Sequence, residues 1–200
     1  MSKKIPIEVS ARHIHLSQKD LEELFGKGYQ LKKLRELVQL GEFVAEEKLD
    51  IQIGSKKISN VKIVGPVRKE TQVELSHTDA IYLKVEPVVK ESGDIQGTPG
   101  AILISSKNKI EIKQGVINTW RHIHCNSEEA EEFGLKDGML VSVQTSGDCS
   151  TTFHNVRVRL NENYKLCMHL DTDEGNAACM PKKGEGIIIK SQNLKLKAQN

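Results

Sequence analysis

The sequence predicts a mainly β protein of two related β-barrel lobes, each capped by a short α-helix. Many short runs of alternating or β-branched residues lie between Gly, Asn, Asp and Ser turns, a pattern typical of strands rather than of a helical bundle. The tetrapeptide Arg-His-Ile-His occurs twice, at residues 12–15 and 121–124. A chain of 200 residues suffices for one large domain or two small ones. Together these observations indicate an internal duplication.

The predicted strands cover most of the chain. Each is a run of four to eight residues with period-two alternation or β-branched side chains, bounded by turn residues. In chain order they are expected at residues 5–9, 42–47, 49–53, 58–64, 71–76, 101–105, 109–113, 139–145, 153–160, 165–170 and 186–190.

Two short helices interrupt this pattern, one after each Arg-His-Ile-His copy. Ser17, followed three positions later by Asp20, is a signature of a helix N-terminus, and a glycine ends the apolar face that follows. In the second copy, Asn126 or Ser127 begins a helix that Gly134 ends. The repeat therefore extends beyond the tetrapeptide to strand, cap, helix and glycine.

The duplication predicts two lobes of similar size. We expect residues 1–90 to form the first barrel with its helical cap and residues 101–190 to form the second. The segment 90–101 combines Ser, Gly, Pro and charged residues, which is typical of a connector. Because barrels in duplicated proteins can exchange strands, the boundary near 90–101 and an exchange of strands are left open.

Charge and composition exclude several classes of partner. The chain has 29 basic and 27 acidic residues without a long run of either sign, so we expect neither nucleic acid nor membrane as a partner. The start MSKKIPIEVSA contains no secretory apolar region. These features predict a cytoplasmic protein that binds small molecules. The four cysteines show no C-x-x-C spacing and are expected to be free thiols.

The paired histidines are candidate metal ligands. In a strand, alternate side chains point to the same face, so His13 and His15 project together and His122 and His124 do the same. Neutral imidazole binds zinc, and a zinc site needs three or four protein ligands. A single His-x-His is often two solvated imidazoles, but two copies in an internal repeat favour metal binding.

A second repeated position supplies the missing ligands. When TQVELSHTDA (71–80) is aligned with KLCMHLDTDEGNA (165–177) on their leucines, Glu74 falls opposite His169. Each lobe then offers two histidines and one further ligand, and the two centres differ in that ligand.

Other residues near these motifs receive different assignments. Asp171 and Asp173 could orient an imidazole as hydrogen-bond acceptors. His77 is a rival ligand, but His77 and His154 both lie outside the aligned position and are expected to be solvated or packing histidines. Glu128 completes a local H-x-H-x3-E spacing that resembles a single-metal cupin site, but an acid there also suits the first turn of a helix.

Arg68 is a candidate anion-binding residue. It lies six residues before Glu74, after a Gly-Pro turn, and its guanidinium can bind phosphate or carboxylate through two hydrogen bonds. An arginine close to metal ligands suits an anionic substrate. The alternative is an ordinary surface ion pair with Glu70.

Several separated motifs, in this order, resemble the PduL-type phosphate acyltransferases, the phosphotransacylases associated with propanediol use. The resemblance covers residues 5 to 190, and the motifs are VSARHIHLS (9–17), GPVRKETQVELSHTDA (65–80), PVVKESGDIQGTPG (87–100), RHIHCNSEEAEEFGLKDG (121–138) and MHLDTDEGNAA (168–178).

The resemblance implies a chemistry. It implies reversible transfer of a propanoyl or acetyl group between coenzyme A and inorganic phosphate, giving an acyl phosphate, on two helix-capped β-barrels with two zinc ions. One zinc would be bound by His13, His15 and Glu74, the other by His122, His124 and His169, and Arg68 would bind phosphate as the catalytic cation. A homodimer is one assembly that we consider.

Two features of the chain differ from the family's pattern. Cys125 stands where a methionine is expected, and because it follows His124 on a strand it should point away from the metal. Only MSKK precedes the first strand, whereas members that enter bacterial microcompartments usually carry an N-terminal amphipathic extension, so we expect no encapsulation. The alternative functions are a dinuclear zinc hydrolase and a non-catalytic metal-binding module.

Overall fold

The computed structural model describes residues 3–86 and 88–189 and shows the predicted mainly β fold. The chain divides into two compact units. Unit 1 comprises Met1–Val9, Arg121–Leu170 and Glu174–Asn200, and unit 2 comprises Ser10–Trp120 and Asp171–Asp173. The expected lobes were 1–90 and 101–190. In the structure, residues 1–9 belong to the unit that contains 121–170, and residues 101–120 belong to the unit that contains 10–100. Strand pairing accounts for both differences.

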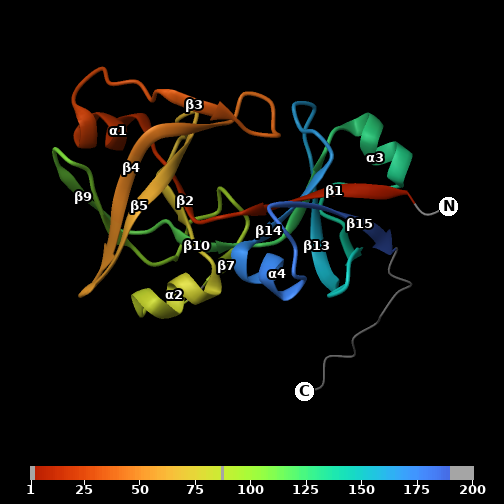
Figure 1. Ribbon diagram of the computed structural model, residues 1–200. Helices are drawn as coiled ribbons and strands as arrows, with labels where there is room; N and C mark the ends of the chain where they lie inside the picture. Colours follow the sequence, from red (N-terminus) through yellow and green to blue (C-terminus); the bar gives the residue numbers. More distant parts are fainter. Residues whose placement is uncertain (1–2, 87, 190–200) are drawn as a thin grey trace. The chain divides into compact units, whose positions relative to one another are not determined.

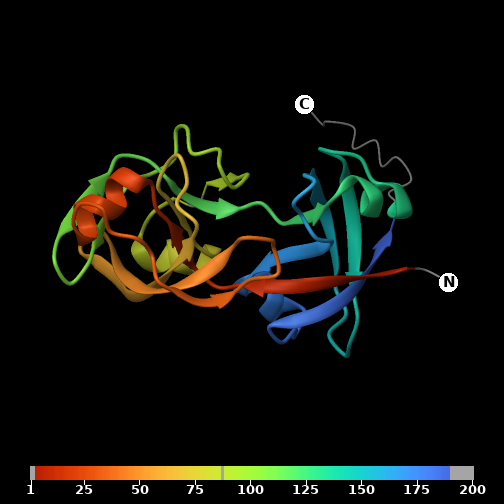
Figure 2. The same cartoon turned by 90° about the horizontal axis from the view of Figure 1, so that it is seen from above.

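The strands of unit 1 form a closed barrel (Figure 1 and Figure 2). Around the barrel they are β1 (Lys4–Ser10), β14 (Cys167–Asp171), β11 (His122–Cys125), β13 (Thr152–Leu160), β12 (Leu140–Thr145) and β15 (Lys183–Ile189). Strand β1 is antiparallel to β15, from Lys4↔Ile187 to Glu8↔Lys183. This ladder is the reason that the start of the chain belongs to unit 1.

Unit 2 contains a nine-stranded curled sheet (Figure 1). Its order is β7 (Val89–Lys90), β10 (Val116–Thr119), β6 (Gln72–Glu74), β2 (His13–His15), β5 (Lys56–Gly65), β4 (Phe43–Ile53), β8 (Ala101–Ile104) and β9 (Lys109–Ile112), with β3 (Lys33–Glu36) paired to β4. The strands predicted at 42–47 and 49–53 are the single strand β4. Because β4 also pairs with β8, the segment after residue 100 belongs to unit 2.

Both predicted helices are present, and both have the predicted caps. Helix α1 (Gln18–Phe25) is capped by Ser17, whose side chain accepts a hydrogen bond from the backbone of Asp20. Helix α3 (Ser127–Phe133) is capped by Asn126 in a reciprocal capping box. Two further short helices, α2 (His77–Leu83) and α4 (Thr172–Ala177), follow β6 and β14 and were not predicted. Among the described residues, no helix is both long enough and apolar enough to span a membrane.

The core of each unit determines which way the histidines point. Ile14 and Ile123, the central residues of the two His-Ile-His strands, are fully buried. Ile14 is paired with Val73 on one side and with Ile63 on the other, within the core of unit 2. Ile123 belongs to the core of unit 1. Because strand side chains alternate, burial of the isoleucine places both neighbouring histidines on the opposite face.

Candidate metal centres

In unit 2, the structure brings His13, His15 and Glu74 together. Strands β2 and β6 are antiparallel neighbours with His13 directly opposite Glu74. The Nε2 atoms of His13 and His15 are 3.2 Å apart, and Glu74 oxygens lie 3.5 Å from His13 Nε2 and 3.6 Å from His15 Nε2. The three side chains thus converge as the repeat predicted.

The hydrogen bonds of the two imidazoles define their tautomers. His13 Nδ1 lies 2.9 Å from the carbonyl oxygen of Ala11, and His15 Nδ1 lies 3.1 Å from that of Val64. A carbonyl oxygen can only accept, so each Nδ1 carries the hydrogen, and the neutral form of each ring presents a lone pair at Nε2. Burial, the largest influence, lowers the pKa of His15 to about 4. Two lone pairs and a carboxylate therefore meet at one point, an arrangement that a bound cation stabilises.

The spacing of these atoms fits zinc. Zinc–ligand bonds of about 2.0–2.1 Å at tetrahedral angles separate two ligand atoms by about 3.3–3.4 Å. The three separations of 3.2, 3.5 and 3.6 Å are close to that edge length. Two imidazoles and one carboxylate also form a ligand set that zinc uses in catalytic sites with an open position.

Hydrogen-bond donors around Glu74 keep it ionised. Its Oε1 accepts from Gln72 Nε2 (2.6 Å) and Ser92 Oγ (2.8 Å), and its Oε2 accepts from Thr119 Oγ1 (2.5 Å). Burial raises the pKa of Glu74, but the electrostatic influence of the adjacent His13 and His15 and the hydrogen bond from Thr119 outweigh it and hold that pKa well below its usual range. The sequence analysis missed these donors, although Gln72 precedes Glu74 by two positions and so shares its face.

Arg68 lies beside this centre. Its Nη1 donates to Ser92 Oγ (2.8 Å), and the same hydroxyl donates to Glu74. Its Nη2 lies 3.3 Å from Glu42 Oε1, so its ion-pair partner is Glu42, whereas the alternative considered from the sequence was Glu70. The backbone N–H of Arg68 donates to the carbonyl of Leu16, one residue after the histidine strand. Arg68 is thus tied to a metal-ligand candidate through one hydroxyl.

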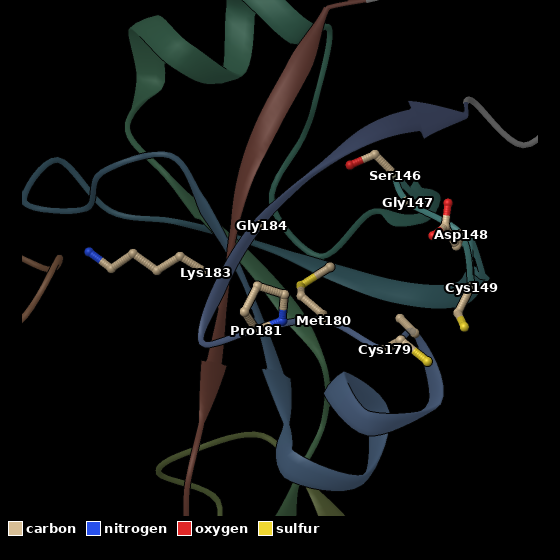
Figure 3. Close-up of a pocket in the computed structure, with 10 residues that line it drawn as sticks. Ser146, Gly147, Asp148, Cys149, Cys179, Met180, Pro181, Lys183 and Gly184 are labelled. Carbon is tan, nitrogen blue, oxygen red and sulfur yellow. The ribbon is translucent and has the colours of Figure 1, made fainter.

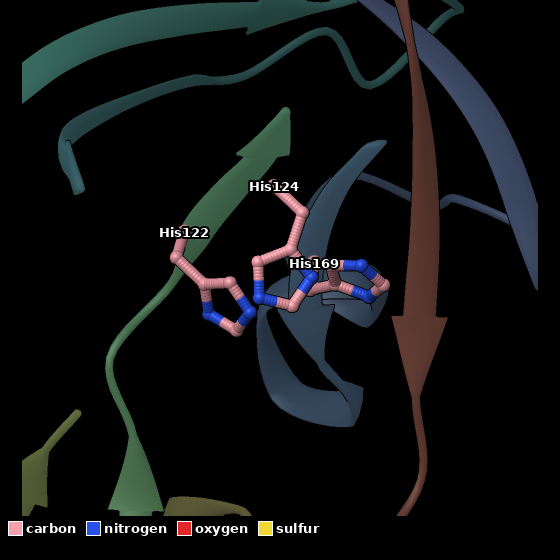
Figure 4. Close-up of side chains that lie close together, drawn as sticks. All are labelled: His122, His124 and His169. Carbon is pink, nitrogen blue, oxygen red and sulfur yellow. The ribbon is translucent and has the colours of Figure 1, made fainter. Parts of the chain in front are cut away.

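In unit 1, His122, His124 and His169 form the second ligand set (Figure 4). One ligand atom of each lies within 4.8 Å of the others. His122 and His124 extend from β11, and His169 extends from β14, where it is directly opposite His122. The ring of Tyr164 stacks on His124 with centroids 3.9 Å apart. Three buried or half-buried imidazoles are a ligand set typical of zinc.

The two centres are built on the same strand arrangement. The first histidine faces the third ligand across an antiparallel ladder in both: His13 faces Glu74 and His122 faces His169. On its other side, each histidine strand has a parallel neighbour, β5 in unit 2 and β13 in unit 1. The structure therefore supports the alignment of Glu74 with His169 that the sequence suggested.

The structure leaves the other candidates outside both ligand sets. His77 is exposed at the start of α2, and His154 Nδ1 contacts Ser142 Oγ at 2.7 Å. Glu128 lies in the first turn of α3, as expected for an acid that interacts with the helix dipole. Cys125 is fully buried in the core, and this burial raises the pKa of its thiol to about 11. Asp173 accepts a hydrogen bond from the backbone of Thr78.

Unit 1 also contains a surface pocket (Figure 3). It has a volume of about 330 Å³, and its lining includes Asp148, Cys149, Cys179 and Lys183. All four cysteines are free, and Cys149 and Cys179 are exposed. None of the six candidate ligands lines this pocket.

The fold and the two ligand sets define a mainly β protein with two candidate metal centres. The sequence model of the family described as phosphate propanoyltransferase matches residues 6–181. The chain belongs to this family.

Curated relatives agree with this assignment. The chain is 47% identical to a phosphate propanoyltransferase of Thermotoga maritima, over 88% of this chain and 84% of the relative. It is 41% identical to a phosphate propanoyltransferase of Listeria monocytogenes, over 96% of this chain and 90% of the relative. It is 45% identical to a phosphate propanoyltransferase of Alkaliphilus metalliredigens, over 94% of this chain and 88% of the relative.

Proposed function

We propose that the protein is a metal-assisted phosphotransacylase that transfers a propanoyl or acetyl group reversibly between coenzyme A and inorganic phosphate. Family membership supports the reaction class. The observation that carries the metal-assisted mechanism is the convergence of two Nε2 lone pairs and the Glu74 carboxylate. We propose one zinc ion at this set and a second at His122, His124 and His169.

The residues around the first centre suit phosphate as the nucleophile. When bound, zinc would supply a Lewis acid for the thioester carbonyl and a soft cation for the departing thiolate. The Arg68 guanidinium, oriented by Ser92 and Glu42, binds the phosphate anion through paired donors. Ser92 links this cation to Glu74, so phosphate is held next to the metal ligands. Phosphate and acyl-CoA are both anions, and this positioning lets the bound phosphate attack the thioester from a fixed distance.

Direct attack of phosphate on the thioester is the mechanism we favour. Burial raises the pKa of the Cys125 thiol to about 11 and that of Cys167 to about 12, so neither offers a thiolate near neutral pH. An acyl-enzyme on either cysteine is therefore disfavoured. Intact-mass measurement after incubation with acyl-CoA without phosphate tests this point, because a covalent acyl adduct would contradict direct attack.

Phosphate dependence of coenzyme A release tests the reaction. Acetyl-, propanoyl- and butanoyl-CoA are each incubated with the zinc-loaded protein, with and without phosphate, and free thiol is measured. We expect release only with phosphate, together with formation of acyl phosphate. Equal release without phosphate would identify the dinuclear zinc hydrolase instead. No turnover with any thioester would leave a non-catalytic metal-binding module.

Metal content tests the two-centre assignment. We expect the parent protein to contain two zinc ions per chain and His13→Ala and His169→Ala each to retain about one, because each variant removes a ligand from a different set. His154→Ala, which lies outside both sets, is the control. If both ligand variants kept the parent's zinc content by elemental analysis, the assignment would be wrong.

A further inference from the structure

An arginine–carboxylate ion pair recurs at the same position in both units. An arginine, Arg12 or Arg121, directly precedes the first histidine of each ligand set. An acid follows the third ligand by five positions in each case: Asp79 after Glu74, and Glu174 after His169. Both acids are the third residue of a helix that begins just after the ligand strand, α2 or α4.

In unit 2 the pair is bidentate. Arg12 Nε donates to Asp79 Oδ2 at 2.8 Å, and Arg12 Nη2 lies 2.7 Å from Oδ1. The Arg12 side chain is 45% exposed, but that of Asp79 is only 8% exposed. Asp79 also accepts from the backbone N–H of Ser76 in the capping box of α2. The arginine thus reaches from the start of the histidine strand to the cap of the next helix.

Unit 1 repeats this connection with a different acid. Arg121 Nη1 pairs with Glu174 Oε1, and Arg121 Nε donates to the carbonyl of His154 at 2.9 Å. The two side chains are 30% and 17% exposed. A helix that was not predicted, α4, therefore carries the counterpart of Asp79.

The position of these pairs matters because both ligand ladders are short. Strand β2 pairs with β6 over three residues, and β11 pairs with β14 over three. His13↔Glu74 and His122↔His169 are the last pairs of their ladders. Terminal pairs of a ladder open at low free-energy cost. Each ion pair lies just beyond such an end and ties the two strands together there.

We propose that Arg12–Asp79 and Arg121–Glu174 are duplicated positioning clamps that hold the first and third ligands of each centre at metal-binding distance. The inference rests on the proposed metal centres and extends them. Exposed ion pairs contribute little to stability, so the expected effect of a clamp is on metal affinity. Outer residues that orient metal ligands typically change metal affinity by about 10- to 100-fold.

Zinc affinity measured separately at each centre tests the clamps. The first centre is titrated in the His169→Ala background and the second in the His13→Ala background, each against a chromophoric chelator at a temperature well below unfolding. We expect Arg12→Ala to weaken zinc binding at the first centre about 10-fold or more and to leave the second unchanged. Arg121→Ala should do the reverse. Arg→Lys variants, which keep the charge but lose the planar fork, should be intermediate.

Asp79→Asn and Glu174→Gln provide a second route if an arginine variant does not fold. They keep the shape of the acid and lose the charge, and Asn can still accept from Ser76. We expect the same loss of zinc affinity, restricted to one centre, and a changed cobalt absorption spectrum at that centre. Lys57→Ala and Lys4→Ala are matched controls, because they remove the Lys57–Asp50 and Lys4–Glu185 ion pairs of units 2 and 1.

Different outcomes separate the clamp from the proposed function. If the clamp variants lowered the Tm but kept the zinc affinity of the lysine controls, the pairs would be structural only and the inference would be wrong. A parent protein that bound no zinc would overturn the metal centres and the clamps with them. A parent that bound zinc without transferring acyl groups would overturn the reaction and leave the clamp intact.

Discussion

At the scale of single residues, hydrogen bonds to backbone carbonyls define the first centre. The carbonyls of Ala11 and Val64 occupy the Nδ1 side of His13 and His15, so Nε2 is the atom each ring offers. Glu74 accepts three hydrogen bonds, from Gln72, Ser92 and Thr119. These contacts suit the deprotonated ligand atoms that zinc would require.

Replacement of Arg68 should impair phosphate use. We expect Arg68→Ala to raise the KM for phosphate about 10- to 100-fold, because a charge-assisted bidentate contact contributes about 1.5–3 kcal/mol. The KM for phosphate of Arg68→Lys should lie between those of the parent and of Arg68→Ala. The exposed Arg35→Ala should have the KM of the parent. The measurement is steady-state kinetics with phosphate varied at saturating propanoyl-CoA. A parental KM for phosphate in Arg68→Ala would contradict the assignment.

The metal-free protein should lose stability as the pH falls from about 6.5 to about 4. The pKa of His15 is 6.5 in the unfolded chain and about 4 in the fold, so in this window the unfolded state binds the proton and is favoured. Glu74, whose pKa is held below its usual value, acts in the same direction at the acidic end. The check is the Tm in chelator from pH 7.5 to 4.5. His15→Gln should show a shallower slope, and an identical slope would exclude His15 as a cause.

At the scale of elements, the short strands depend on their neighbours. Strand β2 has three residues and lies between β5 and β6, and β11 lies between β13 and β14. Isolated segments of this length have no stable conformation in water. Pairing with the backbones of the neighbouring strands therefore holds the histidine strands in place.

The β8–β9 pairing leaves no room for a side chain at Gly100. A Cβ there would lie 2.2 Å from the carbonyl oxygen of Ile112 and 2.9 Å from the carbonyl carbon of Lys113. Because both are backbone atoms, Gly100→Ala should displace the hairpin and cost about 1–3 kcal/mol, measured by urea unfolding. Gly28→Asn is the comparison: its surroundings are open, so any cost there comes from its left-handed φ of +76° and not from a lack of room. Equal stability of Gly100→Ala and the parent would contradict this packing.

At the scale of the whole molecule, a duplicated strand arrangement carries two ligand sets that differ in one residue. Unit 2 offers two imidazoles and a carboxylate, and unit 1 offers three imidazoles. The carboxylate would lower the net charge of a metal complex in unit 2, so a zinc ion bound there would be the weaker Lewis acid of the two. Two proposed metals held in this way would not need to play the same role.

Zinc removal should lower the thermal stability of the protein. A ligand that binds only the folded state stabilises it by about 2.7 kcal/mol at 100 times its Kd, which corresponds to a Tm shift of about 5–10 °C for a chain of this size. Calorimetry before and after chelation measures the shift, and restoring zinc should reverse it. His13→Ala and His169→Ala should each lose part of the zinc-dependent increment. A Tm that did not respond to chelation would contradict zinc binding at both centres.

Local signals and the internal repeat made much of the site predictable. The two His-x-His strands, the helix caps at Ser17 and Asn126 and the pairing of Glu74 with His169 all follow from residues close in sequence or from comparison of the two copies. Period-two alternation determines which side chains share a face, and a capping residue acts within one helical turn. The sequence alone therefore determined the mainly β class and the six candidate ligands.

Only the tertiary structure decided which distant segments meet. It joined β1 to β15, so that Met1–Val9 belongs to unit 1. It brought Thr119 to Glu74, and it paired Arg12 with Asp79 and Arg121 with Glu174, residues far apart in the chain. The register between strands far apart in the chain is selected by packing of both faces and by all neighbouring strands at once, and no local pattern contains that information.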